Sequence, residues 1–382
     1  MNFEKFTFRS VTLLPVLVPL RRPIVSKVGL FDQWPMILIE LATEQGIVGR
    51  SYLEPYLKHA ARYIVPAIHD LAEQRKGHAI RPIEDFQNGR RVLNLIGYEG
   101  VSMIAVSGLD MAAWDALAKA AGMPLAVLLG GSTGPVPAYN SNGLWLTEVA
   151  GLGDDARALV AEGGFKALKL RLGRDRLADD LAAIEAVRSA AGADIKLMVD
   201  FNQGLSLGDA LHRCHALDGQ GLYWFEEPIA YDNFAGYAQL TRELTTPVQL
   251  GENFYGPRAL HQALSMGAGD YVMPDLMRIG GVTGWMRASA IAGAAGVEMS
   301  LSRVFGAPDA RDRNRALAGM AGLGRSHPGR AIRTQRRLPH DPEPARRGPG
   351  MGRRRRQALP VRRIVRAVVG HCRPHCAPTS RC

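Results

Sequence analysis

Three acidic residues, Asp200, Glu226 and Glu252, follow one another at intervals of 26 residues, and each closes a short apolar run. An interval of that length fits one strand-plus-helix unit. In a parallel β/α barrel the C-terminal ends of successive strands converge on one mouth, so three acids in phase can meet around one ion. Carboxylate oxygens are hard ligands that suit Mg²⁺ or Mn²⁺. The spacing therefore predicts a divalent-metal site, although any one of these acids taken alone could simply begin a loop.

Basic and polar residues accompany the three acids. Lys169 and Arg171 are two residues apart on one expected strand, so both should point to the same face, into the barrel beside the metal. Further polar residues end or follow other expected strands, namely Ser141, Asn202, Asp275 and Arg278, and of these Ser141, Asn202 and Arg278 are candidates for binding substrate. Ser141 could bind a substrate carboxylate, but serines at strand ends are also commonly structural.

This set of side chains suits abstraction of a proton next to a carboxylate. The enediolate that such a step leaves must be stabilised by a divalent cation and nearby positive charge. A lysine among cations and partly desolvated can have a lowered pKa and act as the base, although Lys169 could instead form a salt bridge to Asp200. For Arg171 a carboxylate-binding role competes strongly, because guanidinium stays protonated under almost all conditions.

The elements that must hold these residues indicate an α/β fold. Residues 3–50 show strand patterns, and residues 60–129 show helical spacing that ends at two glycines. Seven of the eight strands expected of a β/α barrel then recur at regular spacing: Val136–Ser141, Ala167–Leu172, Ile195–Asp200, Leu222–Glu226, Pro247–Glu252, Tyr271–Asp275 and Val297–Leu301. We therefore predict an N-terminal α+β capping domain (1–132), a parallel β/α barrel (133–302) and a tail (303–382).

Charge separates the tail from the rest of the chain. The 382 residues carry a net charge of +11, but residues 303–382 hold 20 Arg and four acids, so residues 1–302 are net acidic. Such a tail could bind nucleic acid non-specifically, yet it lacks interleaved aromatic residues. Only Cys214 lies outside the tail, so no disulfide framework is expected, in keeping with a cytoplasmic protein. No stretch is expected to span a membrane.

Several stretches together carry a family resemblance: Gly108–Leu117, Met198–Gln203, Phe225–Pro228, Leu250–Asn253 and Met273–Trp285. Over residues 5–300 the chain resembles the mandelate racemase group of the enolase superfamily. The resemblance implies Asp200, Glu226 and Glu252 as metal ligands, Lys169 as a polarising lysine and Arg171 at a base position. It also implies that Asp275 orients a catalytic histidine at the end of the seventh strand.

Two departures from the family pattern affect the expected bases. The family's Lys-x-Lys is here Lys169-Leu-Arg171, and no histidine lies near residue 302, since the nearest are His261 and His327. Read one base later with permitted codons, the chain from Ala316 gives a stretch that resembles the family's eighth strand, and residues 346–359 give one that resembles its C-terminus. We therefore hypothesise a frameshift that makes residues 303–382 non-native sequence.

The expected function is Mg²⁺-dependent abstraction of the α-proton of a 2-hydroxy carboxylate or sugar acid, as a racemase or acid-sugar dehydratase, impaired in this chain. The resemblance implies that the Arg21–Asp32 loop and the Glu54–Tyr56 turn cap the barrel mouth, with Ile24 and Tyr56 as substrate contacts. Charged residues there could favour a hydroxylated acid. The alternative is a catalytically dead metal-binding protein or a basic-tailed protein that associates with nucleic acid. A homo-oligomer is compatible with the sequence.

Overall fold

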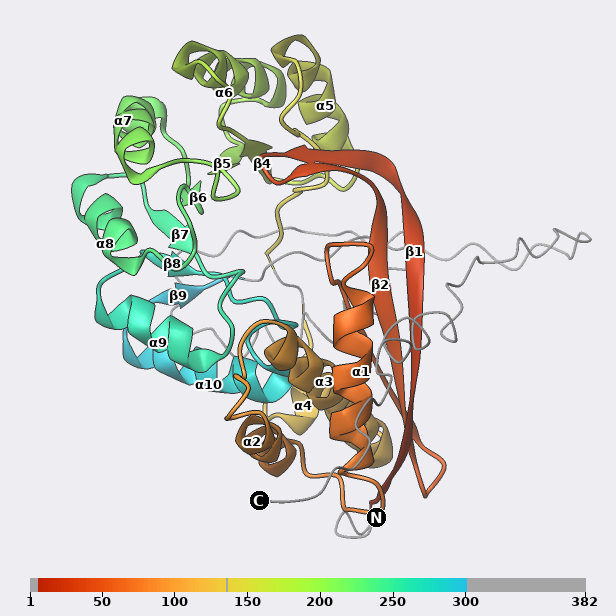
Figure 1. Cartoon of the computed structure of the whole chain (residues 1–382). Helices are drawn as coiled ribbons and strands as arrows, with labels where there is room; N and C mark the ends of the chain where they lie inside the picture. The colour runs from red at the N-terminus through yellow and green to blue at the C-terminus, as the bar shows by residue number, and fades with distance from the viewer. Residues whose placement is uncertain (1–5, 135–136, 301–382) are drawn as a thin grey trace, which may run out of the picture.

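The computed structural model describes residues 6–134 and 137–300, in which two sheets form separate parts of the molecule (Figure 1). The first sheet is antiparallel in the order β1-β2-β3, and the second is parallel in the order β4-β5-β6-β7-β8-β9. The tail predicted at 303–382 lies outside the described residues. An α/β fold with an antiparallel front domain agrees with the sequence prediction.

A long hairpin dominates the front domain. It is formed by β1 (Phe8–Ser26) and β2 (Gly29–Thr43), and β3 (Val48–Leu53) completes the sheet. Figure 1 shows the hairpin arching from the N-terminal side of the molecule to β4. The expected Arg21–Asp32 loop is therefore wrong in detail, because most of it continues the two strands and only residues 27 and 28 make the turn. Gly29 allows this turn with a φ of 145°.

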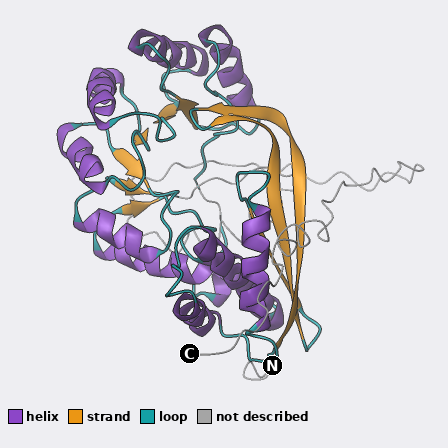
Figure 2. Ribbon diagram, viewed as in Figure 1, coloured by secondary structure: helices purple, strands orange, loops and turns teal. Residues whose placement is uncertain are grey.

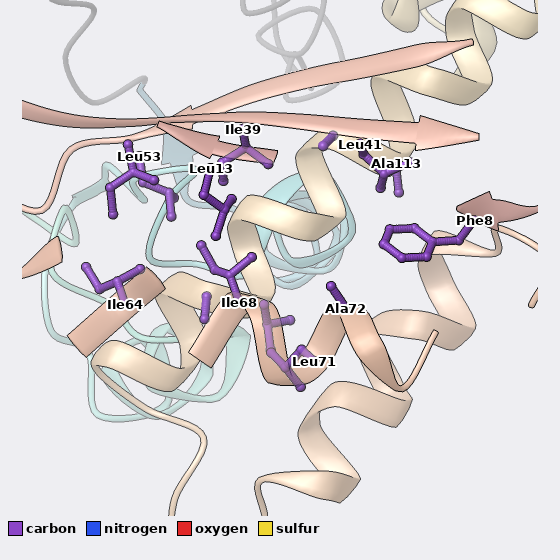
Figure 3. Packing of buried hydrophobic residues seen from close by; sticks show 14 of the residues in the cluster. Phe8, Leu13, Ile39, Leu41, Leu53, Ile64, Ile68, Leu71, Ala72 and Ala113 are labelled. Atoms are coloured by element: carbon purple, nitrogen blue, oxygen red, sulfur yellow. The ribbon is translucent and has the colours of Figure 1, made fainter. Parts of the chain in front are cut away.

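Helices cover one face of the front sheet. The helices of the front domain are α1 (Ala61–Glu73), α2 (Pro82–Val92), α3 (Val101–Ala121) and the short α4 (Leu125–Leu128), of which α1 and α3 pack directly on the strands. In Figure 3, apolar side chains of the sheet face Ile64, Ile68 and Leu71 of α1, and Ala113 of α3 lies beside them. A cavity lined partly by Leu71 remains within this layer. Burial of this apolar face holds the sheet on its helices.

The parallel sheet is built from short strands, and a helix follows each of the strands from β4 to β8 (Figure 2). The strands are β4 (Ala167–Arg171), β5 (Lys196–Asp200), β6 (Phe225–Glu226), β7 (Val248–Leu250), β8 (Tyr271–Val272) and β9 (Glu298–Met299). The helices are α5 (Val149–Ala161) before β4, then α6 (Leu177–Ala191), α7 (Leu207–Leu217) with the 3-10 turn η2 (Asp218–Gln220), α8 (Phe234–Glu243), α9 (Pro257–Ser265) and α10 (Gly281–Ala294). Six of the expected strands thus form, and they lie side by side in the sheet in the order of the sequence, although most are shorter than predicted.

The first expected barrel strand is reduced to one contact. Asn140 makes a single parallel bridge to Leu168, while residues 135 and 136 lie outside the described part of the chain. The last expected strand, Val297–Leu301, is described only as far as residue 300, and β9 accounts for two of its residues.

The sequence prediction that no stretch is long and apolar enough to cross a membrane was wrong, because α3 has the required length and composition. In the fold α3 is the central helix of the front domain. It packs against β3, α1 and α10 and buries residues such as Met103, Ala112 and Ala116. A helix that is apolar on most of its faces is the expected sequence for such a buried position.

Candidate active site at the strand ends

The three predicted ligand residues lie at neighbouring strand ends. Asp200 and Glu226 are the last residues of β5 and β6 and are direct partners in the parallel register, and Glu252 follows β7 by two residues. All three side chains are buried. The constant interval in the sequence thus corresponds to one strand-plus-helix unit, as predicted.

An ammonium group lies between two of these carboxylates. Lys169 Nζ, from β4, is 3.0 Å from Asp200 Oδ2 and also contacts Glu226 Oε1. The indole Nε1 of Trp224 donates a hydrogen bond to Glu226 Oε2 at 3.2 Å. The backbone amide of Asn202 donates one to Asp200 Oδ1 at 2.8 Å. The alternative of a salt bridge between Lys169 and Asp200 is therefore observed, with Glu226 as a second partner.

Burial and the neighbouring charges together set the pKa values of this cluster. Burial raises the pKa of Glu226 to about 8, and the carboxylates of Asp200 and Glu252 outweigh Lys169 and add to the rise. For Asp200, burial is opposed by Lys169 and Arg171, which hold its pKa below the ordinary value. Burial also lowers the pKa of Lys169, but Asp200 and Glu226 outweigh that effect and raise it. The expected lowering of the Lys169 pKa is therefore not what these side chains produce.

The carboxylate oxygens of Asp200, Glu226 and Glu252 suit a hard divalent cation, although the three side chains do not converge on one point. Within residues 6–134 and 137–300, no group of three or more His, Cys, Asp or Glu side chains is close enough together to hold a metal ion as it stands. Lys169 instead neutralises Asp200 and Glu226, which draws both carboxylates to its ammonium. Asp200, Glu226 and Glu252 nevertheless present, at neighbouring strand ends, the carboxylate oxygens that Mg²⁺ or Mn²⁺ prefers.

Arg171 is held firmly on the same face as Lys169. Its guanidinium lies 4.5 Å from the centre of the Trp145 ring, and its Nη1 donates to the carbonyl oxygens of Ser141 at 3.1 Å and Lys169 at 3.4 Å. Its Nε is 3.7 Å from Asp200 Oδ2. Ser141, predicted to bind substrate, thus contributes its carbonyl group to positioning Arg171.

Asp275 and Arg278 lie in the segment between β8 and α10. Asp275 Oδ1 accepts a hydrogen bond of 2.7 Å from the amide of Met277. Arg278 Nη1 donates to Tyr56 Oη at 3.1 Å and to the carbonyl of Glu252 at 3.0 Å, and its guanidinium lies over the Tyr56 ring. Arg278, predicted as a substrate ligand, therefore connects the front domain to the backbone of a predicted metal ligand.

The histidine that the family resemblance implies as the partner of Asp275 is not found among the described residues near Asp275. His261 is exposed on α9, and residue 302 is beyond the last described residue. The sequence offers no histidine between them.

Aromatic side chains from the front domain lie beside the site. Ile24 is buried in a cluster with Trp34 and Trp145, and Tyr56 packs against it, with its ring centre 5.1 Å from that of Trp34. The sequence analysis named Ile24 and Tyr56 but missed both tryptophans. Trp34 could have been found as an inward-facing residue of β2, whereas no local pattern marks Trp145.

Two family descriptions match most of the chain. The N-terminal domain of mandelate racemase / muconate lactonizing enzyme matches residues 8–130, and the enolase C-terminal domain-like family matches residues 151–321. The second match extends beyond residue 302, the end predicted for the barrel. The two matches fall on the front domain and on the barrel.

Solved structures agree with this assignment. An enolase from the alpha proteobacterium bal199 with bound magnesium is 54% identical, covers 78% of this chain and 83% of its own, and superposes with a TM-score of 0.77. A Bradyrhizobium enolase complexed with magnesium and mandelic acid is 37% identical, covers 83% of this chain and 86% of its own, and has the same TM-score of 0.77.

A curated relative from Salmonella typhimurium, L-talarate/galactarate dehydratase, is 33% identical over 205 residues, which are 54% of this chain and 52% of that protein. The chain spans about half the length of the first curated relatives it matches. Fold, family descriptions and solved structures agree nonetheless. The chain belongs to the mandelate racemase / muconate lactonizing enzyme group of the enolase superfamily.

Proposed function

We propose that the strand-end site binds Mg²⁺ and promotes loss of the proton α to the carboxylate of a 2-hydroxy acid, as a racemase or acid-sugar dehydratase does. The observation that carries the proposal is the set of three buried carboxylates on neighbouring strand ends with the Lys169 ammonium between two of them. The related proteins named above act on, or are bound to, galactarate and mandelate, which are both 2-hydroxy acids.

Asp200, Glu226 and Glu252 would hold the metal. A bound divalent cation supplies positive charge that stabilises an enediolate. Lys169, whose pKa the carboxylates raise, stays protonated at neutral pH and presents a second positive charge to a developing oxyanion. Its role here is to stabilise negative charge, and proton abstraction is not favoured.

Arg171 cannot readily take the α-proton. Its guanidinium remains protonated, and its contacts with Trp145, Ser141 and the Lys169 carbonyl fix it in place. We propose that it acts as a fixed cation toward an anionic part of the substrate. With Arg171 in this role and no histidine near residue 302, turnover by this chain should be slow.

The proposal includes the tail. We propose that residues 303–382 are translated from a shifted frame and that the natural catalytic histidine is lost with them. Sequencing the native gene across codons 295–330 tests this. A single extra or missing base that restores a histidine after Met299 supports it, whereas the stated frame in the gene and its relatives excludes it.

Two measurements test the function itself. Calorimetric titration with Mg²⁺ should show one site that is lost in Asp200→Asn. Proton NMR in D₂O should then show slow, Mg²⁺-dependent exchange of the α-proton of mandelate or galactarate. Binding without exchange of either acid would leave the chain a metal-binding protein, and absence of binding would contradict the proposal entirely.

A further inference from the structure

The side chain of Glu227 connects the segments that follow three neighbouring strands. Its Oε2 accepts hydrogen bonds from Gln203 Nε2 at 2.9 Å and from Asn253 Nδ2 at 2.8 Å, and its Oε1 accepts a weaker one of 3.4 Å from the amide of Gly251. Glu227 is 1% exposed, so these contacts are shielded from water. One buried carboxylate thus holds the loops after β5, β6 and β7 together.

Each connected residue adjoins a predicted metal ligand. Gln203 lies three residues after Asp200, Asn253 directly follows Glu252, and Glu227 itself directly follows Glu226. The carboxylate of Glu227 therefore contacts the segments that follow Asp200 and flank Glu252, while its own backbone adjoins Glu226.

Backbone contacts strengthen the same connection. The amide of Gln203 donates to the carbonyl of Glu227 at 2.7 Å, and the amide of Glu227 donates to the carbonyl of Gln249 at 3.0 Å. Gln203 Oε1 accepts from the amide of Tyr231 at 3.0 Å, so both ends of the Gln203 side-chain amide are engaged. The Gln203 side chain is therefore held in one orientation by hydrogen bonds at both of its polar atoms.

The backbone at this point is strained. Five non-glycine residues in the described ranges have a positive φ, and three of them are Asn202 at 46°, Gln203 at 62° and Glu227 at 36°. Residues with side chains occupy this region only where their surroundings fix them, and such strain gathers at functional sites. The hydrogen bonds of Glu227 supply that fixing.

We propose that Glu227 is a positioning residue for the divalent cation, which holds the segments bearing Asp200, Glu226 and Glu252 at the separation that metal binding requires. The inference rests on the proposed function. Residues behind metal ligands orient those ligands, and their loss usually costs about 10- to 100-fold in metal affinity. Glu227 acts through its reach and geometry, since its carboxylate contacts residues that adjoin Asp200 and Glu252.

Three variants of the full chain separate the effect of the side-chain length of Glu227 from the effect of its charge. Glu227→Gln keeps the length and an oxygen for Gln203 and Asn253, Glu227→Asp keeps the charge but is too short, and Glu227→Ala removes both. Calorimetric titration with Mg²⁺ should show affinity reduced at least about tenfold in the Asp and Ala variants and within about threefold of the original chain in the Gln variant.

A matched control comes from Asp180 in α6, another fully buried carboxylate. It accepts hydrogen bonds from the amides of Gly173 and Arg174 and from the guanidinium of Arg213, but it contacts no ligand-bearing segment. Asp180→Asn should lower the melting temperature and leave Mg²⁺ affinity unchanged. Melting temperatures without Mg²⁺ show which variants are folded. If Glu227→Ala does not fold, the comparison of the Asp and Gln variants decides.

The outcomes separate this inference from the proposed function. Absence of Mg²⁺ binding by the original chain overturns both. Binding by the original chain with equal affinity in the Asp and Ala variants overturns only the role of Glu227. The role is also overturned if the Asp variant binds well while the Gln variant does not, or if Asp180→Asn weakens binding as much as Glu227→Ala.

Discussion

The strand ends of the barrel and the junction of α3 with α10 both bury carboxyl groups, but the physical setting differs between these two regions. At the strand ends, burial raises the pKa of Glu226 to about 8, and neighbouring carboxylates, Asp200 first, add to the rise. At the junction, burial raises the pKa of Asp110 to about 7, while hydrogen bonds from Thr283 oppose the rise. One carboxyl group is crowded by like charges, and the other is surrounded by donors.

The junction is a helix cap contributed by another domain. Asp110 Oδ2, from α3, accepts a 2.9 Å hydrogen bond from the amide of Thr283 in the first turn of α10, and Trp114 Nε1 donates to the Thr283 hydroxyl at 2.9 Å. Gly281 passes so close that a Cβ there would lie 2.5 Å from Asp110 Oδ2. A carboxylate at a helix N-terminus satisfies free amides and complements the helix dipole.

The contrast agrees with the proposed function, in which Asp200, Glu226 and Glu252 serve the chemistry while Asp110 serves the fold. Asp110 helps to dock the front domain on the helix that follows the Asp275–Arg278 segment, so its partners are amides and hydroxyl groups. Asp200, Glu226 and Glu252 oppose one another, which costs stability unless positive charge is supplied. Buried carboxylates arranged against one another are typical of functional sites.

The largest expected effect on ligand binding is at the strand ends. Glu226→Gln should weaken Mg²⁺ binding at least about 100-fold, or roughly 2.7 kcal/mol, because a charged ligand is lost. Its unfolding free energy without Mg²⁺ should change by less than about 1 kcal/mol, since relieved repulsion offsets the weakened Lys169 contact. Calorimetry and urea denaturation measure the two quantities. A large loss of stability with unchanged Mg²⁺ affinity would reverse the comparison.

The second effect concerns pH at the junction. The unfolded chain loses the Asp110 proton near pH 4, but the folded chain keeps it until about pH 7, so stability from this group is present below pH 4 and is lost as pH rises to 7. The loss is at most about 4 kcal/mol. Denaturation of the original chain and of Asp110→Asn between pH 4 and 8 isolates it, because other carboxyl groups titrate in both. Parallel pH profiles would show that Asp110 is not responsible.

A third effect tests the close approach at the junction. Gly281→Ala should destabilise the fold by about 3 kcal/mol, because the new methyl group meets Asp110 and the φ of 67° disfavours a side chain. Gly293→Ala in the same helix is the control, since no atom lies within 4 Å of its added Cβ. That control should be neutral or stabilising by up to about 1 kcal/mol. Equal melting temperatures for the two variants would contradict the tight junction.

The sequence predicted the strand ends better than the junction for a physical reason. Asp200, Glu226 and Glu252 are each placed by their own strand, and the constant interval puts all three in phase, so local pattern was enough. Asp110 and Thr283 are 173 residues apart, and both lie in stretches that carried the family resemblance, yet nothing local shows that they meet.

Other features depended on tertiary contacts in the same way. The hairpin arms of β1 and β2 run through the expected Arg21–Asp32 loop because each arm pairs with the other across nearly its whole length. The raised pKa of Lys169 follows from two carboxylates on other strands, and the stacking of Arg171 on Trp145 joins residues far from any shared motif. Spacing placed these side chains on the correct face but did not reveal their partners.

The smallest structural effect tests whether Arg171 limits the chemistry. Arg171→Lys should cost about 1 kcal/mol of stability, because an ammonium group gives up the planar stacking on Trp145 and one of two carbonyl contacts. A lysine can lose its proton where a guanidinium cannot, and Lys169 nearby disfavours a second positive charge. Exchange of the mandelate α-proton in D₂O should therefore rise at least about tenfold, equal to roughly 1.4 kcal/mol in the barrier. Arg171→Met, which fills similar space without an amine, should show no rise. An equal rise in both variants would mean that Arg171 merely obstructs the site, and no rise in either would place the missing base on the opposite face, where the sequence has no histidine.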